Sequence, residues 1–428
     1  MKLFVLIAFI LTYVLMITFS KHRHFIAIGA AILFIVSGAF PLGELAYKIN
    51  WNVLMMLAGT MGTVSLFIDS KMPDKMADLL IKKTPNVMWV AVVLSLFAGI
   101  VSAFVDNVAT VLMIAPVALV VAQRINISPV PLLISIAVSS NLQGAATLVG
   151  DTTSIMLGGY ADMNFMDFLF MNGRPGIFFA VELGAIATVP VIMIIFRKDK
   201  QPVKIDKITE VTDYVPSFLL LGTVMSLIVV SFFSFSISVK SIDITNGVIC
   251  IGFFLIGLIY TICRGNKELF KKVWKEIDVE TLSLLAALFV VIGTLTVQGI
   301  IDDIAELFVK FGGNNVFLMY TLIVWGSVIC SAFIDNIPYV ATMLPVVQGI
   351  SSLMGCTPYV LYFGLLVGAT LGGNITPIGA SANIAAIGIL RKNGYEVKTK
   401  DFLKIGLPFT LIAVLTGYLF CWLVWSKA

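Results

Sequence analysis

The chain has 428 residues, of which 59% are hydrophobic and only 12% are charged. Its mean hydropathy of +1.02 is far from the balance of soluble proteins and predicts an integral membrane protein. The net charge of +4 comes mostly from Lys and Arg between apolar runs, so no nucleic-acid partner is expected. The sequence has no phosphate-binding loop, no G-x-G-x-x-G and no G-x-S-x-G, so neither an ATP-driven pump, a cofactor-dependent enzyme nor a hydrolase is predicted.

Apolar runs recur along the whole chain, and a helix needs about 20 residues to cross a bilayer. The first run, from Leu3 to Phe19, has no A-x-A type cleavage site before Lys21 and is therefore predicted to be a retained span rather than a signal peptide. Further spans are expected near 25–40, 51–69, 215–237 and 246–263. Barrel strands would alternate apolar and polar residues, so the predicted fold is an all-α polytopic membrane protein.

The sequence contains an internal duplication. SAFVDNVATVLMIAPV begins at Ser102 and SAFIDNIPYVATMLPV begins at Ser331, an offset of 331 − 102 = 229 residues. The same offset, 373 − 144 = 229, relates GAATLVGDTTSI from Gly144 to GNITPIGASANI from Gly373. Two independent motifs with one spacing indicate two structural repeats.

The distribution of Lys and Arg predicts that the repeats are inverted, because short cytoplasmic loops carry the excess of positive charge. Residues 70–86 contain four lysines, whereas the corresponding residues 300–315 contain one lysine and three acidic residues. Residues 160–175 contain one arginine and two aspartates, whereas residues 391–404 contain five basic residues. Corresponding loops are therefore expected on opposite sides of the membrane.

We place the first inverted repeat at 1–200, a cytoplasmic linker at 201–214 and the second repeat at 215–428. When the linker lies in the cytoplasm, every basic loop falls on the cytoplasmic side. Both termini then lie on the non-cytoplasmic side, and each repeat crosses the membrane an odd number of times, as inversion requires. The expected location is the inner or plasma membrane.

Each repeat contains an acid and an amide within an apolar segment, Asp106-Asn107 and Asp335-Asn336. The downstream arm of the first segment, Val108 to Ala122, has 15 residues and reaches about 22 Å, which is short of a core of about 30 Å. A re-entrant helical hairpin with the D-N pair at its tip is therefore predicted. The alternative is a solvated surface turn between two complete spans.

A second motif in each repeat predicts a broken transmembrane helix, at 141–160 and at 372–390, because glycine and proline interrupt helices. The ends of such half-helices expose backbone groups that bind ions. The alternative is that the small residues only allow close packing of helices. The candidate ligands in these segments are Thr147, Gly150, Asp151 and Thr152 in the first repeat, and Asn374, Thr376, Gly379, Ser381 and Asn383 in the second.

The three carboxylates of Asp106, Asp151 and Asp335 are the candidate chemical groups. A carboxylate within a membrane is tolerated when it holds a proton or pairs with a cation. No Lys or Arg lies within either motif region, so Na⁺ or H⁺ is the predicted counter-charge. A Na⁺ site is predicted at these carboxylates together with Asn107 and Asn336, with no other cofactor.

In combination, the two D-N segments, GAATLVGDTTS and LGGNITPIGASANI resemble the ion transporter superfamily, in particular the branch of arsenite permeases, NhaD-type antiporters and P proteins. The resemblance covers nearly the whole chain. It implies an elevator-type transporter, often a homodimer, with ion sites between each hairpin tip and its broken helix. Dicarboxylate carriers of the superfamily have S-N-T at the tips, where this chain has an acid that would repel a dicarboxylate.

The sequence therefore predicts a secondary active transporter for a small ion or anion, coupled to Na⁺ or H⁺, with Na⁺/H⁺ antiport as the specific expectation. The alternative is a permease for arsenite, antimonite or another small anion. Na⁺-coupled transport of di- or tricarboxylates ranks below both. Outside secondary transport, the alternatives are a channel or a scaffold in which the broken helices only pack.

Overall fold

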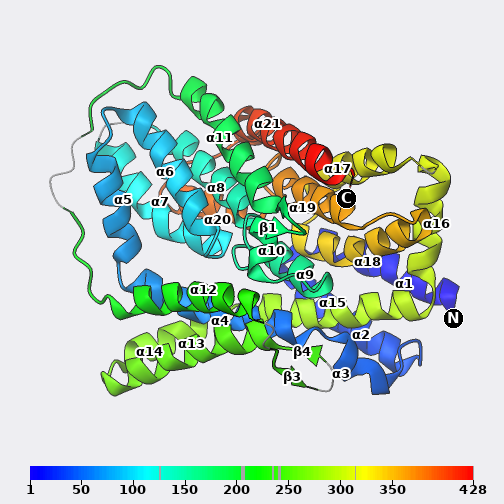
Figure 1. Cartoon of the computed structure of the whole chain (residues 1–428). Helices are drawn as coiled ribbons and strands as arrows, with labels where there is room; N and C mark the ends of the chain where they lie inside the picture. The colour runs from blue at the N-terminus through cyan, green and yellow to red at the C-terminus, as the bar shows by residue number, and fades with distance from the viewer. Residues whose placement is uncertain (125–126, 204–207, 234–235, 240–241, 314, 428) are drawn as a thin grey trace.

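The computed structural model describes residues 1–124, 127–203, 208–233, 236–239, 242–313 and 315–427. Residues 204–207, within the predicted linker, lie outside the described residues. Helices dominate the structure (Figure 1), which confirms the predicted all-α polytopic fold. In the part of the chain described, eight helices are long and apolar enough to cross a membrane, or up to nine when one bent pair is counted as a span.

The first half of the chain contains eleven α-helices and a short β-hairpin in the described residues. The helices are α1 (Lys2–Thr18), α2 (Arg23–Val36), α3 (Leu45–Lys48), α4 (Trp51–Asp69), α5 (Met72–Lys82), α6 (Val87–Ser102), α7 (Asn107–Arg124), α8 (Val130–Gly144), α9 (Thr152–Tyr160), α10 (Phe165–Leu169) and α11 (Ile177–Ile195), with 3-10 turns at η1 (Ser20–His22) and η2 (Leu42–Glu44). Strands β1 (Phe170–Met171) and β2 (Arg174–Pro175) pair antiparallel.

The second half has a similar order of elements. Its helices are α12 (Val215–Phe232), α13 (Thr245–Cys263), α14 (Lys267–Glu276), α15 (Val279–Val297), α16 (Ile300–Gly312), α17 (Val316–Ser331), α18 (Asn336–Met354), α19 (Tyr359–Gly372), α20 (Ser381–Lys392) and α21 (Thr399–Trp425). Strands β3 (Ser238–Val239) and β4 (Ile242–Asp243) form a second antiparallel pair.

Four consecutive helices in each half begin at the spacing that relates the sequence motifs. The first residues of α6 to α9 and of α17 to α20 differ by 316 − 87, 336 − 107, 359 − 130 and 381 − 152, each of which is 229. Equivalent residues also cap equivalent helices, since the Asn86 side chain accepts a hydrogen bond at the start of α6 and Asn315 does so at the start of α17. The duplication therefore extends to the helix boundaries.

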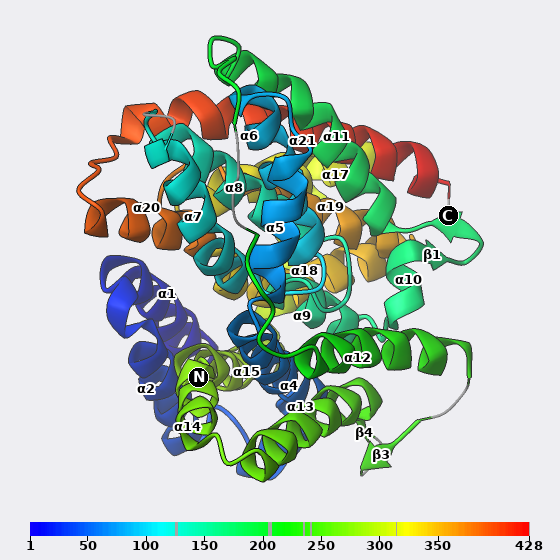
Figure 2. The same cartoon turned by 90° about the vertical axis from the view of Figure 1, so that its left-hand side faces the viewer.

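The helices form two layers, which both views show (Figures 1 and 2). The lower layer contains α1 to α4 and α12 to α15, in which α4 packs against α13 and α2 against α15. The upper layer contains α6 to α11 and α17 to α21, in which α6 packs against α8, α17 against α19 and α11 against α21. Helices α5 and α16 lie at opposite ends of the molecule in Figure 1.

Small residues allow close packing in the upper layer, as the alternative interpretation of the glycines expects. A Cβ on Gly368 would lie 2.4 Å from the carbonyl oxygen of Val324, and one on Gly372 would lie 2.6 Å from the Cα of Val328. The four-residue spacing of these glycines places both on the face of α19 that meets α17. Gly372 is thus a packing residue.

The downstream arm of the first D-N segment lies within α7, which has 18 residues. Beyond the predicted apolar arm, Val108 to Ala122, the helix adds Asn107 at its start and Gln123 and Arg124 at its end. At 1.5 Å per residue this helix is about 27 Å long, still short of a core of about 30 Å. The re-entrant hairpin and the depth of its tip stay predictions.

Candidate functional site

The first tip is the short connection between α6 and α7, and Asp106 lies directly before α7. Oδ1 of Asp106 accepts hydrogen bonds from the backbone N–H groups of Val108 at 3.0 Å and Ala109 at 3.1 Å. A helix N-terminus carries only about half a unit of positive charge. Among the described residues no ion pair reaches Asp106, so its carboxylate keeps a net negative charge when it is ionised.

The first tip fits tightly against the interruption between α8 and α9. A Cβ on Gly150 would lie 2.6 Å from the carbonyl oxygens of Gly144 and Ser102 and 2.7 Å from that of Ala103. The hydroxyl of Thr147 donates a hydrogen bond to the carbonyl of Ala103. Gly150 and Thr147 therefore hold the tip backbone against the broken helix.

The second tip is fastened in the same way. A Cβ on Gly379 would lie 2.5 Å from the carbonyl oxygen of Gly373, 2.8 Å from that of Ser331 and 3.0 Å from that of Ala332. The hydroxyl of Thr376 donates to Ala332. The duplicated glycine and threonine thus fix the tip backbone against the interruption in each half.

A buried polar network connects the first tip to both broken helices. The amide of Asn107 donates to Oδ1 of Asn141 at 2.9 Å and to Oδ1 of Asp151 at 3.3 Å. The amide of Asn141 in turn donates to the carbonyl of Thr370 at 2.7 Å and to Oδ1 of Asn374 at 3.0 Å. Asn141 therefore joins the two halves of the chain at their centre.

Asp151 takes part in this network through both of its oxygens. Its Oδ2 accepts a hydrogen bond from the hydroxyl of Thr153 at 2.5 Å, and that hydroxyl lies 3.0 Å from the hydroxyl of Thr370. The Asp151 residue is 4% exposed. A carboxylate so deeply buried is stable only with hydrogen-bond donors or a counter-charge, and the donors are present.

At the second tip, Asp335 caps α18 and accepts the backbone N–H of Ile337 at 3.0 Å. Its Oδ2 accepts a hydrogen bond from Ser381 at 3.2 Å and pairs with the guanidinium of Arg23, the first residue of α2. Asn383 donates to two backbone carbonyls of the second interruption. The expectation that Asp335 has no basic partner is therefore wrong, because Arg23 reaches it from a helix that is distant in the sequence.

A cavity of about 300 Å³ lies between the two layers. Lining side chains from the upper layer include both tips and the beginnings of α9 and α20, and those from the lower layer come from α2, α4 and the α14–α15 junction. The residues that line it are Arg23, Met61, Val64, Ser65, Ile68, Asp106, Asn107, Val108, Ala109, Leu112, Asp151, Thr152, Glu276, Asp278, Thr281, Asn336, Ile337 and Ser381. Four of these are acidic and one is basic, so the cavity attracts cations.

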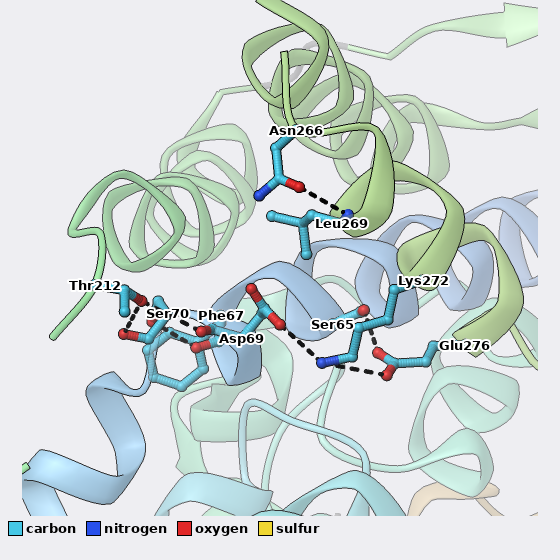
Figure 3. Close-up of polar contacts among 9 residues, drawn as sticks. All are labelled: Ser65, Phe67, Asp69, Ser70, Thr212, Asn266, Leu269, Lys272 and Glu276. Atoms are coloured by element: carbon cyan, nitrogen blue, oxygen red, sulfur yellow. Dashed lines mark hydrogen bonds and ion pairs between the residues drawn. The ribbon is translucent and has the colours of Figure 1, made fainter. Parts of the chain in front are cut away.

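Figure 3 shows how α14 holds one wall of this cavity in place. Nζ of Lys272 lies 2.7 Å from the Asp69 carboxylate at the end of α4 and 4.0 Å from that of Glu276. The hydroxyl of Ser65, which also lines the cavity, donates to Glu276. Thr212 donates hydrogen bonds to the carbonyl of Ser70, so the linker closes the end of α4 as well.

The structure brings together six of the predicted site residues around the cavity, namely Asp106, Asn107, Asp151, Thr152, Asn336 and Ser381. Asp335 joins them through Arg23 and Ser381. The other predicted ligands do not line this cavity: Thr147, Gly150, Asn374, Thr376, Gly379 and Asn383. Gly150 lines instead a small further cavity, which Asp106 and Asp151 also line.

Sequence reasoning missed the lower-layer side of the site. Arg23 was visible only as a basic residue in a connecting turn, where it serves equally well as a topology signal. Glu276 ends the amphipathic, lysine-rich helix α14 and Asp278 follows it, and no motif marks either residue. Asn141 lies inside the predicted broken helix, and its polar side chain in an apolar helix was the available signal. In the described residues, no group of three or more His, Cys, Asp or Glu side chains could hold a metal ion.

Two solved transporter structures share this fold. The YdaH transporter of Alcanivorax borkumensis superposes with a TM-score of 0.62, covering 89% of this chain and 87% of that chain at 13% identity. MtrF of Neisseria gonorrhoeae, described as one of a class of antimetabolite efflux pumps, superposes with a TM-score of 0.58, covering 92% of this chain and 84% of that chain at 16% identity. At this identity the likeness concerns the fold alone.

Relatives in sequence are also transporters. The uncharacterized transporter Rv2684 of Mycobacterium tuberculosis is 29% identical, over 97% of this chain and 96% of its own length. The uncharacterized transporter slr0753 of Synechocystis is 26% identical over 99% of this chain and 98% of its length. The human P protein is 26% identical over 95% of this chain, which spans 58% of that protein. A family model described as "Citrate transporter" matches residues 13–368, so the chain belongs to the citrate transporter family and is a multi-pass membrane transporter.

Proposed function

We propose that this transporter couples the movement of its substrate to a monovalent cation bound at the first tip, and that it exchanges Na⁺ for H⁺. The observation that carries the proposal is Asp106, which lies in a cavity between the two layers without a basic partner among the described residues. Asp151 and Asn107 line the same cavity. A carboxylate in this setting is stable when it binds a cation or a proton.

The side chains around the first tip suit the binding of Na⁺ as well as of H⁺. Asp106 and Asp151 supply carboxylate oxygens, and hard oxygen ligands suit hard cations. Oδ1 of Asp106 is engaged by two backbone N–H groups, and Oδ2 is the oxygen that remains for a cation. Na⁺ and H⁺ would compete for the same negative charge, which is the physical requirement for exchange of one for the other.

The proposed movement is an elevator-type shift of the upper layer along the lower layer. The two repeats are proposed to be inverted, and both contribute helices to each layer. The cavity at the boundary between the layers supports it, since relative motion there would change the side from which the cavity is reached. The positions of α5 and α16 at opposite ends of the molecule (Figure 1) fit a two-fold relation between the repeats, and the reversed charge of the corresponding loops is what favours inversion. In this arrangement the linker is cytoplasmic and both termini are non-cytoplasmic.

The test is Na⁺-driven proton flux in proteoliposomes that contain a pH-sensitive dye. Asp106→Asn keeps the shape of the side chain and removes its charge, so it should abolish the flux. The matched control is Asp302→Asn, which makes the same change at an exposed residue in the first turn of α16, outside this cavity. Equal flux in Asp106→Asn and the unmodified protein would remove Asp106 from the mechanism.

A carboxylate substrate is the second candidate function, and Arg23 is the observation that favours it. The family description names citrate, and a guanidinium in the cavity offers a bidentate partner for a carboxylate. The four acidic lining residues oppose it, because they repel a free polyanion. A flux panel of Na⁺, Li⁺, arsenite, phosphate and citrate separates this candidate and the arsenite alternative from antiport. A homodimer stays a prediction, which the mass of the detergent-solubilised protein tests.

A further inference from the structure

We propose that Arg23 is a tethered cation that permanently replaces the mobile cation at the second tip, so that the transporter binds one Na⁺ per chain rather than one at each tip. The inference rests on the proposed function and specifies its stoichiometry. It starts from the difference in charge between two tips that the duplication otherwise makes alike.

The second tip is fully occupied in the structure. Oδ1 of Asp335 accepts the backbone N–H of Ile337 at 3.0 Å, and Oδ2 is shared between the guanidinium of Arg23 and the hydroxyl of Ser381. The side chains of Arg23 and Asp335 are 26% and 15% exposed. An ion pair shielded from water to this degree is screened little by salt, so a mobile Na⁺ competes poorly for this carboxylate.

The first tip has no such partner. Helix α2, which supplies Arg23, packs against α15, and the corresponding pair in the other half is α13 packed against α4. The sequence of α13, TNGVICIGFFLIGLIYTIC, contains no Lys or Arg. Asp106 therefore faces the cavity with its charge uncompensated by any described basic side chain, whereas Asp335 is neutralised by the chain itself.

A second polar contact between the lower layer and α18 supports the position of Arg23 at the second tip. The hydroxyl of Tyr13 in α1 donates to the carbonyl of Pro338 and contacts the hydroxyl of Thr342, both in α18. Helices α1 and α2 thus hold α18 at its N-cap residue, Asp335, and within its first two turns, at Pro338 and Thr342. Two contacts fix the approach of the lower layer to the second tip, so the guanidinium meets Asp335 in a defined geometry rather than as a chance surface pair.

The experiment counts bound ²²Na⁺ per chain in the purified full-length protein. The unmodified protein should bind one Na⁺, and Asp106→Asn should bind none. Arg23→Gln frees the carboxylate of Asp335 and should bind two. The double variant Arg23→Gln with Asp335→Asn removes both charges and should return to one, while Arg23→Lys keeps the positive charge and should also bind one.

The outcomes separate this inference from the proposed function. If Arg23→Gln binds one Na⁺ with the affinity of the unmodified protein, the tethered-cation inference is wrong while coupling at Asp106 stands. Binding of two Na⁺ to the unmodified protein, or none to Arg23→Lys, would also overturn it. Absence of Na⁺ binding in the unmodified protein, together with absence of Na⁺-driven proton flux, would reject the proposed function itself. Where Arg23→Gln does not fold, the counts in the unmodified protein, Asp106→Asn and Arg23→Lys decide.

Discussion

Asn141 makes the most sharply testable contribution to stability, because its side chain connects three segments in the centre of the upper layer. It accepts a hydrogen bond from Asn107 at 2.9 Å and donates to the carbonyl of Thr370 at 2.7 Å and to Asn374 at 3.0 Å. Asn141→Leu keeps a similar volume and removes all three bonds. The change also leaves the buried groups of those three partners with fewer hydrogen bonds.

The expected loss follows from the number of bonds. Side-chain hydrogen bonds in membrane proteins contribute on average about 0.6 kcal/mol and at most about 1.7 kcal/mol each. Loss of three bonds should therefore lower the free energy of unfolding by about 2 to 5 kcal/mol. Reversible unfolding in mixed detergent micelles, titrated with dodecyl sulfate and followed by circular dichroism, measures this difference.

Ser135 provides the matched control, since it lies on the same helix and is fully buried. Its hydroxyl has no hydrogen-bond partner among the described residues. Ser135→Ala removes no hydrogen bond and takes away a buried hydroxyl without a partner, so it should not lower the free energy of unfolding. An equal absence of loss for Asn141→Leu would show that the network adds no stability and would refute the reasoning.

The remaining predictions concern the tips and the orientation of the chain. Gly150→Ala and Gly379→Ala each force a methyl group against three backbone oxygens and should lower the unfolding free energy by about 1 to 3 kcal/mol. Gly29→Ala is the control and should not destabilise the protein, because nothing lies within 4 Å of its added Cβ. Equal thermal shifts in detergent for all three variants would contradict the packing argument. Cysteines placed at Asp162 and Lys398 should react with a membrane-impermeant maleimide from opposite faces of the membrane, and reaction of both from one face would exclude inverted repeats.

The features of the fold that sequence could predict are local ones. Long apolar runs define helices because each must satisfy its own backbone groups in lipid, and the helices of the structure begin close to the expected residues. The 229-residue offset appears in the sequence and again in the starts of α6 to α9 and α17 to α20. Pro116 lies inside α7 without ending it, because a proline inside a membrane helix can be accommodated by its neighbours.

The site was predictable only where its residues belong to the repeated motifs. Asp106, Asn107, Asp151 and Asn336 come from these motifs and line the cavity, and ion binding by them stays a prediction. Arg23 lies 312 residues from its partner Asp335, and no periodicity or motif relates residues so far apart. Both halves of the duplication predict the same chemistry at the two tips, so the asymmetry introduced by a single arginine from the lower layer is a property of the tertiary structure alone.

Helix α4 connects the cavity at the tips with a second cavity of about 680 Å³. Met61, Val64 and Ser65 line the first, and Asn50 and Asn52, near the other end of the same helix, line the second. At the second cavity, which Gly159 also lines, α4 is in tight contact with α9: a Cβ on Gly159 would lie 2.5 Å from Cγ2 of Val53, and the amide of Asn50 donates to the carbonyl of Gly159 at 2.9 Å. Because Gly159 has no side chain, α9 of the upper layer approaches α4 of the lower layer this closely. A larger residue at this position would have to displace the side chains of Val53 and Asn50, so the glycine sets the distance between the two layers at this cavity.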